Sequence, residues 1–271
     1  MAGQTDIILS IGDYEAHLFF DGIYPTPITD LLHSDPAGLE RVVARLDAPI
    51  IEIDVNCFGL DGPEGLILVD AGTGEHWGPA YGKAPDAMRA AGFELEQVKT
   101  VLLTHIHGDH ALGLLDGEAA RFPNAEIRLP RTEADHYGDS SKFERPPEGC
   151  RTLERLRRAY GARLSWVDPG LVLPGIEAIA LPGHTPGHTG YLVRGNDRAM
   201  LFWGDVVHIE ALQLTDPLLG FDYDVDFEAA QRSRQFALDV AARQGWYIGG
   251  GHVKGFRQIE RRGAGFSFRE E

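Results

Sequence analysis

The stretch "THIHGDH" at positions 104–110 restricts what this chain can fold into more than any other feature of its sequence. It follows an apolar run that predicts a short strand, and side chains two apart in extended backbone point the same way. His105 and His107 can therefore reach one metal ion. Asp109 and His110 follow where the chain turns toward a helix, so they aim at a neighbouring point. This mixture of nitrogen and carboxylate ligands suits divalent ions such as zinc, and it predicts two adjacent sites.

Five more ligand-type side chains come later, each in a loop at the end of a predicted strand. "LPGHTPGH" places His184 and His188 in a glycine- and proline-rich loop between two strands. The apolar run "MLFWG" leads to Asp205, with His208 three residues beyond, and "YIGGGH" ends at His252. Loops at the ends of separate strands can converge on one pocket, so these residues are candidate partners of the first cluster.

The chain between these motifs predicts two groups of strands, each followed by helices. Strands are expected at 50–60, 65–70, 99–104, 126–130, 176–181, 190–194 and 199–205, with a last one at 246–252. Helices are expected at 37–49, 84–91, 131–137, 150–161 and 226–245. This order predicts an α/β (α+β) fold in which two sheets pack face to face with helices outside, a four-layer αββα sandwich.

Two further stretches are interpreted as loops. "DGIYPTPITDLL" at 21–32 contains two prolines and is expected to be a loop. The acidic "FDYDVD" at 221–226 could be another metal site, but a loop before a helix with Asp226 as its N-cap is the preferred interpretation.

Composition excludes several classes of protein. The net charge of −16 and the pI near 5.0 argue against a nucleic-acid surface. No run of apolar residues is long enough to span a membrane, and the first residues lack the features of a secretory leader. The two cysteines suggest no disulfide framework. With no linker between halves, residues 1–271 are expected to form one cytoplasmic domain.

Taken together, these motifs resemble the metallo-β-lactamase fold superfamily, and the chain is most similar to its methyl parathion hydrolase and lactonase-like group. The resemblance rests on "THIHGDHALGL", "FPNAEI", "GHTPGHTGYLV", "WGDVVHIEALQL", "FDYDVDFEAAQRSR" and "GFSF". It implies an αββα core of two mixed sheets over residues 50–255. It also implies that residues 1–48 form an N-terminal segment covering the pocket.

The resemblance also implies a ligand set for two metal ions. The first ion would be held by His105, His107 and His188, the second by Asp109, His110 and His252, and Asp205 would bridge both. His184 is not part of this set and is expected to brace its loop by hydrogen bonds. Asp70 matches a strand-ending aspartate that supports the site from behind the ligands.

The implied activity is hydrolysis of lactones or other carboxylic esters, and also of phosphotriesters, by a hydroxide held between two divalent cations. Zinc is the expected metal, while iron, cobalt and manganese would accept the same ligands. Asp109 could pass a proton to the leaving group. His208 stands where related lactonases have a tyrosine that helps the substrate carbonyl, and both a catalytic and a packing role stay open for it.

Three alternatives remain at this stage. They are a thioester hydrolase of the glyoxalase II type, a non-hydrolytic metal-binding sensor, and a binding module on the same fold. The expected partner is a small-molecule ester, lactone or phosphotriester, with no nucleic acid and no membrane, and a homodimer is left open.

Overall fold

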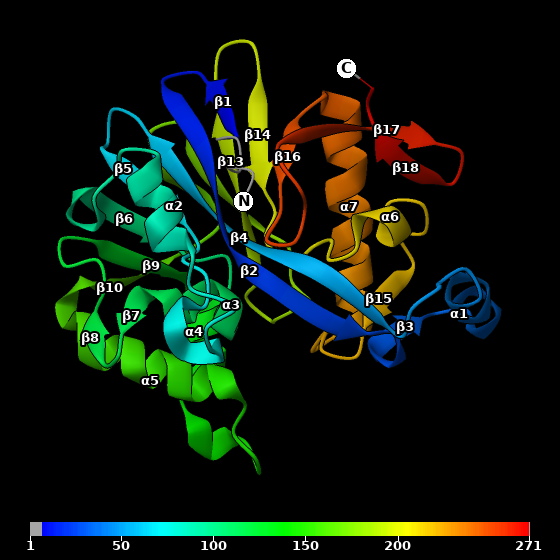
Figure 1. Ribbon diagram of the computed structural model, residues 1–271, viewed down its shortest axis with the longest axis horizontal. Coiled ribbons are helices and arrows are strands. Elements are labelled where there is room, and N and C mark those ends of the chain that lie inside the picture. The colour runs from blue at the N-terminus through cyan, green and yellow to red at the C-terminus, as the bar shows by residue number, and fades with distance from the viewer. Residues whose placement is uncertain (1–6, 271) are drawn as a thin grey trace.

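Two mixed β-sheets of seven strands each lie face to face in the computed structural model, which describes residues 7–270 (Figure 1). The first sheet has the order β1 (Ile8–Ile11), β2 (Tyr14–Pro27), β4 (Ile50–Asp61), β5 (Leu66–Val69), β6 (Val98–Leu102), β9 (Glu126–Pro130), β10 (Leu164–Val167). The second has the order β11 (Gly170–Leu173), β12 (Ile176–Ala180), β13 (Thr189–Arg194), β14 (Ala199–Phe202), β16 (Tyr247–Gly249), β17 (Arg257–Arg262), β18 (Gly265–Phe268). Two short pairs join β3 (Leu31–His33) to β15 (Leu219–Phe221) and β7 (Leu115–Asp116) to β8 (Ala119–Ala120).

Helices cover the outer faces of both sheets. The helices of the described residues are α1 (Pro36–Val43), which packs beside β3, and α2 (Ala84–Ala90), α3 (Gly108–Ala111), α4 (Arg131–Tyr137), α5 (Glu148–Tyr160), α6 (Glu210–Gln213) and α7 (Phe227–Gln244). Figure 1 shows α2, α4 and α5 on the side of the first sheet and α7 on the side of the second. The predicted four-layer αββα sandwich is therefore confirmed.

The central strands lack polar residues because both of their faces are buried. In β5, Ile67 and Val69 point into the core between the sheets, while Leu66 and Leu68 point toward the helices. Strand β14 divides in the same way, with Met200 and Phe202 facing the first sheet. Alternating side chains of one strand thus serve two different cores, which is why these runs are continuously apolar rather than alternating.

The longest helix, α7, begins and ends where the sequence predicts. The Asp226 side chain caps it by accepting a hydrogen bond from the Ala229 amide at 2.9 Å. Gly245 ends it in the left-handed region at φ 64°, which glycine adopts without steric cost. The interpretation of "FDYDVD" as a loop before a helix is confirmed.

The prediction of a loop at 21–32 is wrong over most of its length. Residues up to Pro27 continue β2, which pairs with β4 in a register that sets Pro25 opposite Glu52 and Pro27 opposite Ile50. The Ile28 amide donates to the Pro49 carbonyl, so the amide positions of Pro25 and Pro27, three residues and one residue earlier, face away from β4. Strand β1 pairs with β2 only up to His17, so among residues 7–270 no strand needs backbone donors from the proline positions on that edge.

The sheets also extend beyond the predicted core of residues 50–255 at both ends. Strand β2 lies inside the first sheet, and "WYIGGGH" is not the last strand of the second. Strands β17 and β18 follow it and form a hairpin at the edge. Because β17 buries only Ile259 and carries charged or polar residues at its other positions, its sequence lacks the apolar run by which the other strands are recognised.

Two predictions from composition can be compared with the structure. Cys57 and Cys150 are both free and buried, as expected for a chain without a disulfide framework. Among residues 7–270, none of the helices combines the length and apolar character that crossing a membrane requires.

We predict that the core between the sheets carries a large share of the stability. Phe202 is fully buried there and packs against Phe58, with ring centroids 4.9 Å apart. Phe202→Ala should lower the free energy of unfolding of the metal-free protein by about 3–5 kcal/mol, measured by chemical denaturation. Phe236→Ala is the matched control, because that ring is 53% exposed on α7 and its loss should change stability by less than about 0.5 kcal/mol. Equal effects of the two substitutions would contradict this assignment of the core.

Candidate metal centre

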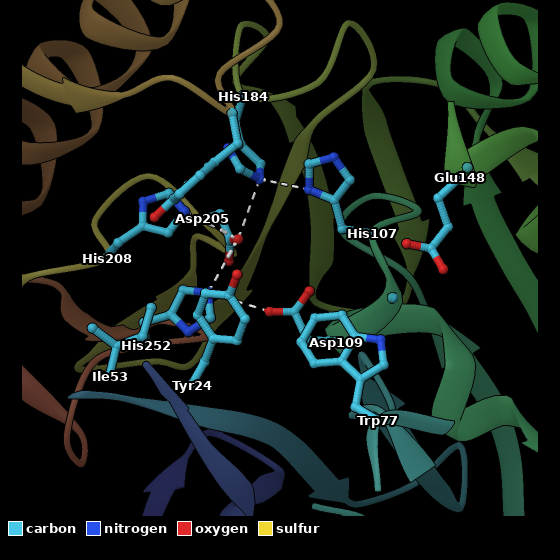
Figure 2. Close-up of a pocket in the computed structure, with 13 residues that line it drawn as sticks. Tyr24, Ile53, Trp77, His107, Asp109, Glu148, His184, Asp205, His208 and His252 are labelled. Atoms are coloured by element: carbon cyan, nitrogen blue, oxygen red, sulfur yellow. Dashed lines mark hydrogen bonds and ion pairs between the residues drawn. The ribbon is translucent and has the colours of Figure 1, made fainter. Parts of the chain in front are cut away.

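The ligand-type side chains of the sequence motifs meet at one edge of the sandwich, where strands of both sheets end. Asp70 follows β5, and the "THIHGDH" stretch follows β6 and enters α3. From the second sheet, His184 lies in the loop between β12 and β13, Asp205 follows β14, and His252 follows β16. Figure 2 shows His107, Asp109, His184 and His252 arranged around Asp205.

One group of potential ligands consists of His105, His107, His184 and Asp205, whose ligand atoms all lie within 4.8 Å of one another. The His107 Nδ1 and His184 Nε2 atoms are 2.9 Å apart. The Asp205 Oδ2 atom lies 3.3 Å from His184 Nε2 and 3.8 Å from His105 Nε2. Three imidazoles and one carboxylate at this spacing match the ligand set of a zinc-type site.

A second group shares Asp205 and adds Asp109, His110 and His252, again within 4.8 Å. Asp205 Oδ1 lies 3.0 Å from His110 Nε2, while its Oδ2 lies 3.2 Å from His252 Nε2. Asp109 Oδ2 is 3.5 Å from the same His252 nitrogen. The Asp205 carboxylate therefore faces both groups, and this is the position the sequence predicts for a bridging ligand.

Several atoms of these groups are buried without a hydrogen-bond partner among the described residues. They include His105 Nε2, and also His110 Nε2 and Asp205 Oδ1, which lie 3.0 Å apart without the geometry of a hydrogen bond. Leaving buried polar atoms unpaired costs free energy, so such a concentration calls for an additional partner. The donor set of imidazole and carboxylate fits a pair of divalent cations.

Burial keeps two of the first-group imidazoles neutral. Desolvation lowers the pKa of His105 well below its ordinary value, and His110 beside it lowers it further. The pKa of His107 is lowered in the same way, by burial first and by His184 second. A neutral imidazole is the form that coordinates a metal ion, so these two rings are prepared for that role.

The groups around Asp205 show the opposite pattern. Burial alone would lower the pKa of His110, but the carboxylates of Asp205 and Asp109 outweigh it and raise that pKa well above its ordinary value. Burial alone would also lower the pKa of His184, but hydrogen bonds with Asp205 and Asp224 raise it to about 9. The protons on these histidines take up ligand nitrogens that a metal ion would use, and metal binding would release them.

Partners behind the ligands fix the orientation of the rings. Asp70 Oδ2 lies 2.8 Å from His110 Nδ1, and its Oδ1 accepts a hydrogen bond from the Thr104 amide at 2.8 Å. The predicted supporting role of Asp70 is confirmed. His252 Nδ1 lies 2.6 Å from the Asp54 carbonyl oxygen. Such contacts select the tautomer that leaves Nε2 free for a metal.

Asp224 supports the site, and the sequence analysis did not identify it. Its Oδ1 atom lies 2.9 Å from His184 Nδ1, and it is buried. The only signal was the acidic "FDYDVD" stretch, in which nothing distinguishes Asp224 from its neighbours. Its partner His184 lies 40 residues earlier, so only the folded chain brings the pair together.

The structure groups His184, rather than His188, with His105, His107 and Asp205 as a potential ligand. His188 Nδ1 lies 3.0 Å from the Leu181 carbonyl oxygen, and its Nε2 accepts a hydrogen bond from the Asp205 amide at 3.0 Å. Both nitrogens are therefore engaged with backbone, and burial lowers the pKa of this ring to about 3. Close by, Gly204 has φ 55°, and a Cβ there would lie 2.6 Å from His188 Nε2. His188 positions the Asp205 loop, the bracing role predicted for His184.

His208 lies inside the site, with its Nε2 atom 3.2 Å from Asp205 Oδ2. Its ring stacks on His252 with centroids 5.0 Å apart, and burial lowers its pKa to about 4. The Gln213 side chain accepts a hydrogen bond from the His208 amide at 2.7 Å, which holds the backbone of this loop. His208 is therefore a neutral imidazole at neutral pH.

A pocket of about 200 Å³ opens over both ligand groups. Its wall includes Tyr24 from β2, Ile53 from β4, Trp77, Tyr223 and Glu148. Figure 2 shows Tyr24 and Ile53 on the side of His252 and Glu148 on the side of His107. Tyr24 lines the pocket, whereas Trp203 and Phe221 are core residues. Among the described residues no lysine or arginine lines this pocket.

Known proteins give independent comparisons. The family model described as Metallo-beta-lactamase superfamily matches residues 51–252. An N-acyl homoserine lactonase of Bacillus sp is 23% identical over 213 residues, which are 70% of this chain and 78% of that protein. The crystal structure of hydrolase AbOPH in the beta lactamase superfamily has a TM-score of 0.87 at 25% identity, covering 97% of this chain and 96% of that one. AidC, a dizinc quorum-quenching lactonase, has a TM-score of 0.85 at 22% identity, covering 98% and 97%.

We predict that two substitutions will separate the roles of the two loop histidines. His184→Ala should reduce the number of bound metal ions from about two to about one per chain, because it removes a ligand-type nitrogen from the first group. His188→Ala should keep about two ions and lower thermal stability instead. Elemental analysis after metal replenishment and desalting measures the first effect, and a thermal melt of metal-free protein measures the second. The reverse result would restore His188 as the ligand.

Proposed function

The chain belongs to the metallo-beta-lactamase superfamily, and from this premise we propose that it is a dinuclear metal-dependent hydrolase of neutral lactones and other carboxylic esters. The observation that carries the proposal is the position of Asp205, whose carboxylate lies between two groups of histidines beneath a largely apolar wall. The first group would use His105, His107 and His184. The second would use Asp109, His110 and His252.

Substrate class is proposed from the wall of the pocket. Lactonase relatives act on N-acyl homoserine lactones by their names, and such substrates carry an apolar chain and no charge. Tyr24, Ile53 and Trp77 offer apolar surface for such a chain. A substrate carboxylate or phosphate would meet Glu148 and no lysine or arginine among the described residues. This disfavours β-lactams and phosphodiesters, whose negative charge would lack a protein partner.

The mechanism follows from the chain's own residues. Two divalent cations, when bound, would supply Lewis acidity and a water of lowered pKa. Asp205 would neutralise charge at both positions while Asp70 and Asp224 hold the tautomers of His110 and His184. Asp109 lies at the pocket wall beside His252 and could carry a proton to the leaving oxygen. Neutral His208 could donate an N–H to the substrate oxygen.

Several features of the sequence analysis remain proposals beside this one. They are hydrolysis of phosphotriesters, zinc as the particular metal, a single domain with a pocket-covering N-terminal segment, a homodimer and a cytoplasmic location. Thioester hydrolysis and a non-hydrolytic metal-binding role are the alternatives to be separated from it by experiment.

The direct test is a hydrolysis panel on protein loaded with zinc. We expect turnover of N-acyl lactones and aryl esters, increasing with the length of an apolar acyl chain, and loss of that turnover with a chelator. Parallel assays cover a phosphotriester, a thioester and a β-lactam. Turnover of the thioester alone would favour the glyoxalase II-type alternative. A protein that binds two ions and cleaves none of these compounds would be a binding protein instead.

We predict a catalytic contribution from His208 that is separable from metal binding. His208→Ala should keep about two ions and lower turnover by about 10- to 1000-fold, the scale of one lost hydrogen-bond donor to a developing oxyanion. His208→Tyr should restore part of the activity on lactones, because a phenol also donates. His136→Ala, a histidine on α4 away from the pocket, is the control and should leave turnover unchanged. Unchanged kinetics of His208→Ala with metal retained would place this residue outside the chemistry.

A further inference from the structure

A buried glutamate joins two of the loops that form the site, and the geometry points to a role for it. We propose that Glu133 is a positioning residue for the first ligand group, acting by holding the backbones of two ligand loops with one carboxylate. This inference rests on the proposed function to the extent that the first group binds a metal ion. Glu133 itself touches neither substrate nor metal.

The contacts of Glu133 are short and directed at backbone. It lies in the first turn of α4 and is 0% exposed. Its Oε1 atom accepts a hydrogen bond from the Ile106 amide at 3.1 Å, and its Oε2 atom accepts one from the Gly187 amide at 2.8 Å. Each carboxylate oxygen thus serves a different segment of the chain.

Both segments carry ligands of the first group. Ile106 lies between His105 and His107 in the loop after β6 of the first sheet. Gly187 lies three residues after His184 in the loop before β13 of the second sheet. Since neither loop is regular secondary structure at these amides, a shared acceptor fixes their relative position. The result is visible in the 2.9 Å between His107 Nδ1 and His184 Nε2.

The loop at Gly187 packs so closely against the start of α4 that a side chain has no room there. A Cβ built on Gly187 would lie 2.3 Å from the Glu133 amide nitrogen and 2.9 Å from its Cα. Both are backbone atoms that cannot move aside without moving α4. The loop of His184 therefore rests directly on the start of the helix that carries Glu133.

The chemistry of the site requires a carboxylate rather than another side chain. Two amide donors converge on it, and a carboxylate offers an acceptor to each. Burial raises the pKa of Glu133 to about 7, and the hydrogen bond from the Gly187 amide opposes that rise. A glutamine of the same size would present an NH₂ group to one of the two amides, leaving two donors facing each other.

The test compares metal binding of the wild type with that of Glu133→Gln and Gly187→Ala. Zinc is titrated into metal-free protein against a chromophoric chelator, which gives one dissociation constant per ion without any assay of activity. We expect Glu133→Gln to weaken one of the two ions by about 10- to 100-fold, the usual effect of losing an outer partner of a metal site. The other ion should keep its affinity. Gly187→Ala should act in the same direction.

Asp135→Asn is the matched control, since this carboxylate lies on the same helix and is exposed. It should leave both constants unchanged. Circular dichroism and thermal melts of all variants show whether each is folded. Two unchanged constants in Glu133→Gln would overturn the proposal. An equal loss at both ions together with a lower melting temperature would also overturn it, because that pattern belongs to a merely structural residue.

A second measurement keeps the inference separate from the proposed function. In metal-free protein, the amide resonances of Ile106 and Gly187 should shift in Glu133→Gln, and the ring resonances of His107 and His184 should shift with them. Ring resonances identical to those of the wild type would overturn the positioning role whatever the metal content. A wild type that binds fewer than two ions would instead refute the dinuclear site.

Discussion

A buried carboxylate surrounded by histidines is the interaction on which the rest of this structure depends. Asp205 is only 3% exposed, and its oxygens lie within 4 Å of ring nitrogens of five histidines. Burial would raise its pKa, but the surrounding imidazoles, His110 and His252 foremost, lower it well below the ordinary value. A buried charge persists only when it is paired, so these rings and Asp205 require one another. The remaining architecture brings them together.

The two sheets accomplish this by ending their strands at one edge. Large side chains such as Phe58 and Phe202 fill the space between the sheets and set their separation. With that separation fixed, short loops after β6, β12, β14 and β16 reach the same point. A histidine moved by one residue in any of these loops would face another direction. The precision of the site is therefore inherited from an apolar core that contains none of its residues.

The sequence predicts those parts of the structure that depend on local pattern. Strands β5 and β14 and helix α7 are recognised because their periodicity and caps are contained within short windows. Strand β2 is not, because its prolines are tolerated only at an edge that lies free of a partner, and that edge is a property of the whole sheet. The choice between His184 and His188 also depends on the folded chain. Both fit the spacing, and only the folded loop shows that backbone groups engage both nitrogens of His188.

Each ligand group draws on both sheets, and this links metal binding to the packing of the sandwich. In the first group, His105 and His107 come from the first sheet and His184 from the second. In the second group, His110 comes from the first sheet and His252 from the second, and Asp205 serves both groups. An ion held by either group would thus join the two halves across their interface. Because such an ion binds the folded chain and finds no preformed site in the unfolded one, its binding free energy adds to the free energy of unfolding. Neighbouring carboxylates raise the pKa of His110 in the absence of an ion, so the ring holds a proton that metal binding would release. The contribution of metal binding to stability must therefore grow as the pH rises.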